Sequence, residues 1–216
     1  MQERIEERRA FLLLLSLVLV ILMNPVLDHG TFRRVILGFL TFVPLVLTTI
    51  KMSEKKQWVW PFVFLISGSV ICAIAGAILS SGFLVALRWT LMTLAFGLSV
   101  IVLFSYLQQA RTVTVEHLYT AASIYLLIGI SWFALYSAIE NIYPGSFLQA
   151  TAGSTNRPSD LLYFSLVTLT TVGYGDILPG SGEVRMLAAL EAATGVLYVA
   201  ITVALLVSAY KQRDQE

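Results

Sequence analysis

Residues 170–176 read Thr-Thr-Val-Gly-Tyr-Gly-Asp, and this stretch decides the fold that the sequence predicts. It lies between two long apolar segments near the end of a very hydrophobic chain. Gly173 and Gly175 stand at alternate positions, and glycine adopts positive φ angles at no steric cost. Carbonyl groups alternate in an ordinary strand, and positive φ at every second residue turns them toward one side. We therefore expect an irregular loop with a row of carbonyl oxygens facing one way.

The composition of the chain is that of a membrane protein. Hydrophobic residues make up 57% of its 216 residues and charged residues only 12%, whereas soluble domains carry about 25% charged residues. A net charge of +1 offers no basic surface, so no nucleic-acid partner is expected. The single cysteine excludes an internal disulfide. No nucleophile–base pair or metal-ligand cluster stands out, so we expect neither an enzyme nor a bound cofactor.

Long apolar segments recur along the chain, and a bilayer-spanning helix needs about 20 such residues. Six segments qualify, the second being short and interrupted by proline: roughly Ala10–Leu27, Val35–Ile50, Trp58–Leu79, Phe83–Leu107, Leu118–Glu140 and Val184–Tyr210. A shorter helix is predicted over Ser159–Thr170, directly before the glycine-containing loop. The sequence thus predicts an all-α polytopic membrane protein with six transmembrane helices and one re-entrant helix.

The run Thr171-Val172-Gly173-Tyr174-Gly175 resembles the selectivity filter of tetrameric potassium channels, and we call these five residues the filter loop. The resemblance extends over about Asp160–Tyr210 and is to bacterial six-span members with a two-helix pore module. It implies a homotetramer in the lipid bilayer, because rings of backbone carbonyls from four chains replace the water shell of a potassium ion. The carbonyls of all five residues and the hydroxyl of Thr171 would then bind K⁺.

The same resemblance divides the chain into two parts. Residues 111–216 would form a pore unit of outer helix, pore helix, filter loop and inner helix, and residues 1–110 a four-helix peripheral unit. The expected function is passive, potassium-selective conduction. Two alternatives remain open at this point: a non-conducting or accessory membrane subunit that keeps the pore fold, and a weakly selective cation channel.

Residues beside the filter loop are expected to support it. Thr170 and Asp176 flank the loop and complete the family signature. Phe164 stands where many family members carry a tryptophan behind the filter, so an aromatic ring is kept but the indole donor toward Asp176 is lost. These three residues are therefore assigned to filter support and the outer mouth.

The inner helix carries the residues expected at the hinge and cavity. Gly195 resembles the family's hinge glycine, and close helix packing is the other interpretation. Val199, Val203 and Val207 share one helical face because they are spaced by four residues. That apolar face is predicted to line the cavity as a hydrophobic gate, although a packing seam would show the same pattern.

Glu191 is the one acidic residue expected inside a spanning segment of the pore unit. Acids at membrane depth are costly and are usually paired or functional. Ser165, Thr168 or Thr170 could satisfy the carboxyl group behind the filter loop. Alternatively, Glu191 would face the upper cavity and attract cations.

Charge placement predicts orientation and argues against a voltage sensor. Lysine and arginine are more frequent at the N-terminus, at 51–56 and in the tail than in the opposite loops. Both termini are therefore expected to be cytoplasmic, in a multi-pass protein of the plasma membrane. Arg88 is the only charged residue between Trp58 and Leu107. The chain lacks the repeated arginines of voltage-sensing helices, so the peripheral unit is expected to sense voltage weakly or not at all.

Overall fold

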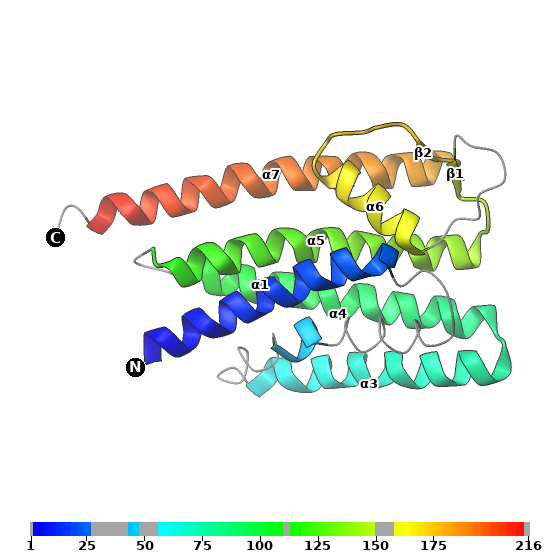
Figure 1. The fold of residues 1–216 in the computed structure, drawn as a ribbon, viewed down its shortest axis with the longest axis horizontal. Coiled ribbons are helices and arrows are strands. Elements are labelled where there is room, and N and C mark those ends of the chain that lie inside the picture. Colours follow the sequence, from blue (N-terminus) through cyan, green and yellow to red (C-terminus); the bar gives the residue numbers. More distant parts are fainter. Residues whose placement is uncertain (1, 27–42, 48–55, 110–112, 150–157, 214–216) are drawn as a thin grey trace. The chain divides into compact units, whose positions relative to one another are not determined.

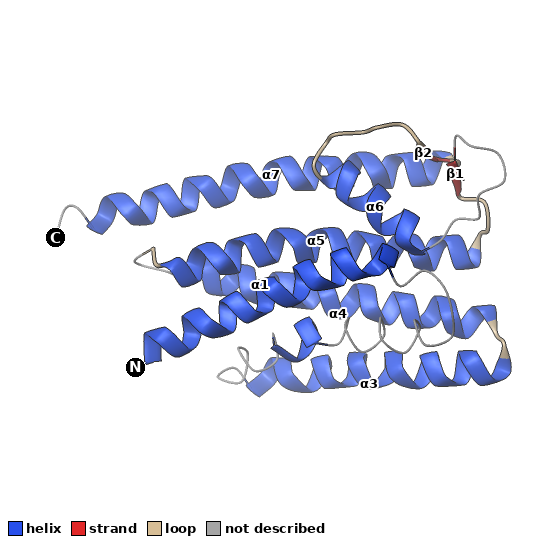
Figure 2. Cartoon of the chain, viewed as in Figure 1, coloured by secondary structure: helices blue, strands red, loops and turns tan. Residues whose placement is uncertain are grey.

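The computed structural model describes residues 2–26, 43–47, 56–109, 113–149 and 158–213, and almost all of them are helical (Figure 1). The long helices are α1 (Gln2–Val26), α3 (Lys56–Leu79), α4 (Gly82–Gln108), α5 (Val115–Ile142), α6 (Pro158–Leu169) and α7 (Gly182–Arg213). Two short strands, β1 (Phe147–Gln149) and β2 (Ile177–Pro179), complete the described elements (Figure 2). The predicted all-α membrane architecture is confirmed.

Four helices in the described part of the chain are long and apolar enough to cross a membrane. They are Val59–Leu79, Gly82–Gln108, Val115–Ile142 and Gly182–Ser208, which correspond to the third to sixth predicted spans. The first predicted span, Ala10–Leu27, overlaps α1 as far as Val26; α1 is a helix but is not among these four. The second, Val35–Ile50, lies largely outside the described residues. The number of six spans therefore stays a prediction.

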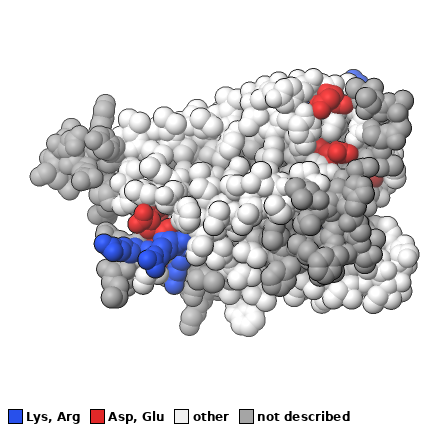
Figure 3. Space-filling view, viewed as in Figure 1, with Lys and Arg blue, Asp and Glu red and all other residues white. Residues whose placement is uncertain are grey.

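The visible surface of these helices carries few charged side chains. Figure 3 shows Lys, Arg, Asp and Glu gathered in small groups, with broad uncharged areas elsewhere on that face. Large apolar side chains are exposed along the spanning helices, among them Phe64 on α3 at 72% and Ile101 on α4 at 58%. Lipid is the environment that such a surface suits.

The chain forms two compact units, and each combines segments that are distant in the sequence. The first unit comprises residues 1–59, 97–128 and 197–216, and the second comprises residues 60–96 and 129–196. Helices α4, α5 and α7 are each divided, with one part in the first unit and the other part in the second. The functional boundary expected near residue 110 stays a prediction.

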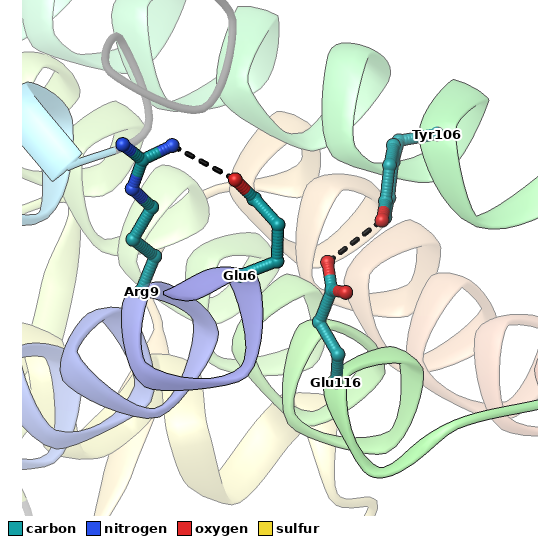
Figure 4. A network of polar contacts seen from close by, with 4 residues as sticks. All are labelled: Glu6, Arg9, Tyr106 and Glu116. Carbon is teal, nitrogen blue, oxygen red and sulfur yellow. Dashed lines mark hydrogen bonds and ion pairs between the residues drawn. The ribbon is translucent and has the colours of Figure 1, made fainter. Parts of the chain in front are cut away.

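Polar contacts in the first unit lie near helix ends. The Arg9 guanidinium forms an ion pair with Glu6 at 2.8 Å, and the Tyr106 hydroxyl donates to the Glu116 carboxylate at 2.7 Å (Figure 4). The Arg9–Glu6 ion pair is partly exposed, and such pairs contribute little to stability, whereas the Glu116 carboxylate is buried. Deeper in the unit, Tyr198 of α7 donates to a backbone carbonyl of α5, that of Ala121, at 2.7 Å. This bond joins the second half of α7 to the first half of α5.

A small antiparallel sheet lies in the second unit. Strands β1 and β2 pair with Leu148 opposite Leu178 at the centre, and the Gly180 amide donates to the Ser146 carbonyl at 2.7 Å. The carboxylate of Glu140, near the end of α5, accepts the amides of Gly145 and Phe147 at 2.9 and 3.2 Å. The segment after α5 is thereby tied to the segment after the filter loop.

Candidate functional site

The filter loop has an alternating backbone. Gly173 and Gly175 have φ angles of +58° and +77°, which confirms the expectation of positive φ at both glycines. Thr171 also has a positive φ of +59°, which the glycine pattern did not reveal. A β-branched residue in this region is strained by about 1–3 kcal/mol. Positive φ thus occurs at positions 171, 173 and 175, the alternation that turns successive carbonyls to one side.

The carbonyl groups of this loop have no hydrogen-bond donors. Among the described residues, no group donates to the carbonyl oxygens of Thr171–Gly175. The side chains of the loop are exposed as well, Val172 at 53% and Tyr174 at 70%. Backbone carbonyls left unsatisfied at membrane depth are unfavourable unless water, an ion or other protein meets them.

Helix α6 leads directly into the loop. It spans twelve residues, as the sequence predicted, and its end continues through the Thr170, Thr171 and Val172 amides, which donate to carbonyls three to five residues earlier. The C-terminus of a helix carries a partial negative charge that favours cations nearby. At its other end, Asp160 accepts a hydrogen bond from Gln149 of β1 at 2.8 Å.

Two glycines allow neighbouring helices to approach α6 closely. A Cβ at Gly195 of α7 would collide with the carbonyl oxygen of Leu169, the last residue of α6, and lie 3.0 Å from its carbonyl carbon. A Cβ at Gly129 of α5 would lie 3.0 Å from the Leu166 side chain. The sequence allowed two interpretations of Gly195, a hinge and close helix packing. The structure shows the close packing contact. Gly129 was missed, because a glycine in an apolar helix gives no signal of its partner.

Glu191 of α7 is fully buried behind α6 and hydrogen-bonded on both carboxyl oxygens. Its Oε1 lies 2.5 Å from the Ser165 hydroxyl oxygen, and the Tyr136 hydroxyl donates to Oε2 at 2.6 Å. The Ser165 oxygen also lies 2.7 Å from the carbonyl oxygen of Gly129. Of the hydroxyls considered from sequence, Ser165 is the one that contacts Glu191, and Tyr136 was not anticipated.

Phe164 belongs to a buried aromatic cluster. Its ring packs edge to face against Tyr136 of α5 and Phe147 of β1, with centroid distances of 5.4 and 5.3 Å. Tyr136 and Phe147 contact each other in the same way at 5.2 Å. These contacts hold α6 against α5 and β1, so Phe164 supports the pore helix from the side of α5.

Tyr163 is the aromatic residue that approaches Asp176. Its ring stacks parallel to Tyr174 with a centroid distance of 6.3 Å. Partial burial, together with its interaction with the Asp176 carboxylate, raises the pKa of the Tyr163 phenol. The sequence analysis assigned the aromatic residue near Asp176 to Phe164 and missed the adjacent Tyr163. Helical geometry gave the usable signal, because adjacent residues of a helix point about 100° apart and only one can face the loop.

The three valines of the inner helix lie in the first unit and are about half exposed. Val199, Val203 and Val207 keep 48–55% of their surface accessible. Val199 and Val203 also border an apolar groove of about 360 Å³ between α5 and α7. The shared face predicted from their spacing is thus about half exposed in the part of the chain that the structure describes.

Part of the chain is similar to known ion channels. Residues 112–212 match the protein family described as "Ion channel". This segment contains α5, α6, the filter loop and α7. No solved structure matches the chain.

Several curated relatives are potassium channels by name. Two pore potassium channel a of Oryza sativa subsp. japonica is 39% identical over 80 residues, which are 37% of this chain and 20% of the relative. Two-pore potassium channel 4 of Arabidopsis thaliana is 34% identical over 76 residues, 35% of this chain and 23% of the relative. The inward rectifier potassium channel Kirbac3.1 of Paramagnetospirillum magnetotacticum is 32% identical over 80 residues, which are 37% of this chain and 23% of the relative. The matched part is thus about a fifth of each relative's length.

The contact at Gly195 predicts a specific sensitivity to substitution. In Gly195→Ala the added methyl group meets the backbone of Leu169, which no rotamer change relieves. We expect a loss of about 1–3 kcal/mol of stability, measured as a lower melting temperature in detergent. Gly182→Ala is the matched control on the same helix, because nothing lies within 4 Å of its added Cβ. Equal melting temperatures for the two variants would contradict the close contact.

Proposed function

We propose that this chain is the subunit of a potassium-selective channel that conducts K⁺ passively across the membrane. The observation that carries the proposal is the row of carbonyls at Thr171–Gly175, which have no donor among the described residues and positive φ at alternate positions. Carbonyl oxygens in such a row replace the hydration shell of K⁺. The Thr171 hydroxyl would add a further oxygen at the inner end of the filter loop.

The potassium preference is supported by the relatives as well as by the loop. The relatives matched by this part of the chain carry potassium channel in their names. Tyr163 and Asp176 would hold the outer end of the filter loop through their contacts with each other and with Tyr174. A supported loop keeps its oxygens at distances that suit one ion, which favours selectivity over general cation conduction.

A homotetramer is the assembly that we propose for this site. Each chain supplies one filter loop, and a ring of oxygens around an ion needs several copies. The exposed side chains of Val172 and Tyr174 would be covered by neighbouring copies. An irregular loop at membrane depth is tolerated when protein or a water-filled cavity surrounds it, and four copies around one axis provide both.

The inner helix would form the remainder of the pathway. We place Val199, Val203 and Val207 toward the cavity below the filter loop, where an apolar lining can close the pore by dewetting. Gly195 would then be the fixed point above this lining. We further propose a plasma-membrane location with both termini in the cytoplasm, in accord with the bias of positive charge.

Selectivity is the most direct test. Liposomes containing the purified protein should take up K⁺ far faster than Na⁺, and bi-ionic reversal potentials should lie well away from zero. Reversal potentials near zero would instead support a weakly selective cation channel, and no flux of either ion would support a non-conducting subunit.

Gly173→Ala should abolish this flux. A Cβ disfavours the positive φ of +58° by about 1–2 kcal/mol in each chain, and relief of that strain would turn carbonyls away from the ion. No atom lies within 4 Å of the added methyl group, so backbone strain is the cause under test. Gly182→Ala, outside the filter loop, should keep wild-type flux; loss of flux in both variants would refute the backbone explanation.

Stoichiometry provides a second test. Native mass spectrometry of the detergent-solubilised protein should show four copies of the chain. Cross-linking in lipid should give products of at most four chains. A stable monomer or dimer that still conducts K⁺ would be incompatible with the proposed assembly.

Voltage dependence is expected to be weak. The Arg88 guanidinium lies 5.1 Å from the ring of the adjacent Trp89, and it is the only charged group between Trp58 and Leu107. One charge crossing 100 mV contributes about 2.3 kcal/mol, whereas steep gating uses about three to four charges per subunit. Arg88→Gln should therefore leave the slope of the conductance–voltage curve nearly unchanged. A wild-type slope that requires several charges per chain would show that other groups sense voltage.

A further inference from the structure

The cluster of Tyr136, Ser165 and Glu191 contains more short oxygen contacts than its hydroxyl groups can explain. Three pairs of oxygen atoms lie at hydrogen-bond distance: Tyr136 Oη with Glu191 Oε2 at 2.6 Å, Ser165 Oγ with Glu191 Oε1 at 2.5 Å, and Ser165 Oγ with Gly129 O at 2.7 Å. Each short contact needs one proton between its oxygens. Tyrosine and serine supply one hydroxyl proton each. The third proton must come from another group.

We propose that Glu191 is a neutral, protonated carboxylic acid that donates to Ser165 and thereby holds the inner helix on the pore helix. Its O–H donates from Oε1 to Ser165 Oγ, the Ser165 hydroxyl donates to Gly129 O, and Tyr136 donates to Oε2. This arrangement places one proton in each of the three contacts. An ionised carboxylate would leave either Glu191 Oε1 or Gly129 O facing the Ser165 oxygen without a proton.

The surroundings of the carboxyl group support the neutral form. Glu191 and Ser165 are fully buried, and so is Tyr136. No positive side chain balances a charge here: in the described part of the chain, the one salt bridge is that between Arg9 and Glu6. The titratable group that faces Glu191 from α5 is Tyr136, and α6 presents the non-titrating Ser165. A buried carboxylate without a counter-charge is strongly disfavoured.

The acid joins three helices at one point. Glu191 belongs to α7, Ser165 to α6, and Tyr136 and Gly129 to α5. Ser165 lies four residues before Leu169, and Glu191 lies four residues before Gly195, so the hydrogen-bonded contact and the close glycine contact follow one another by about one helical turn. Protonated Glu191 is thus a positioning residue for the pore helix. The inference goes beyond the proposed function and does not depend on ion conduction.

Infrared spectroscopy tests the proton directly. The reconstituted wild-type protein at neutral pH should show the carbonyl-stretch band of a buried carboxylic acid, which Glu191→Gln should lack. Glu183→Gln is the matched control, because Glu183 is an exposed glutamate on the same helix; it should retain the band. A band absent from the wild type, or unchanged in Glu191→Gln, would overturn the proposal. If Glu191→Gln does not assemble, the wild-type band alone decides: it should be present at neutral pH and disappear as the pH is raised.

The pH dependence of melting gives an independent test with a defined sign. An exposed glutamate loses its proton near pH 4.3 when the chain unfolds, whereas the folded protein is proposed to keep it. Stability contributed by this acid is therefore fully present below about pH 4.3 and is lost as the pH rises. The melting temperature of the wild type should fall relative to that of Glu191→Gln between acidic and alkaline pH. The opposite trend, or none, would show an ionised carboxylate in the folded state.

Discussion

Five consecutive carbonyl groups have no hydrogen-bond donor among the described residues, and they lie between helices suited to a membrane. These carbonyl groups impose the constraint on which the structure depends. A helix satisfies its own backbone, and so do the spanning segments of this chain. The filter loop does not, and it is held in a strained form with positive φ at a threonine as well as at two glycines. Such a loop persists when its surroundings over-determine it. The neighbouring helices α5, α6 and α7 supply those surroundings.

The support is divided between close packing and polar contacts. Gly195 lets α7 approach the backbone of α6, and Gly129 lets α5 approach the leucine side chains of α6. The cluster of Tyr136, Phe147 and Phe164 fills one flank with edge-to-face aromatic contacts. The hydroxyl of Tyr136 then reaches the Glu191 carboxyl group. One tyrosine therefore serves both the apolar and the polar contacts, which links the position of α6 to two neighbouring helices at once.

Local chemistry explains which features were predictable. The short helix before the loop and positive φ at Gly173 and Gly175 follow from residue type and spacing, and the structure confirms them. The φ of Thr171 did not follow, because only the alternation of the assembled loop demands it. Tyr136 and Gly129 were missed because their partners are 55 and 36 residues away. Apolar helices give almost no pattern that fixes such pairings.

The close contact at Gly195 has a mechanical consequence for α7. The helix continues from that contact to Arg213, eighteen residues or about 27 Å further. Three residues beyond Gly195, the Tyr198 hydroxyl donates to the Ala121 carbonyl of α5, so any tilt of α7 at the glycine contact must also move or break this bond.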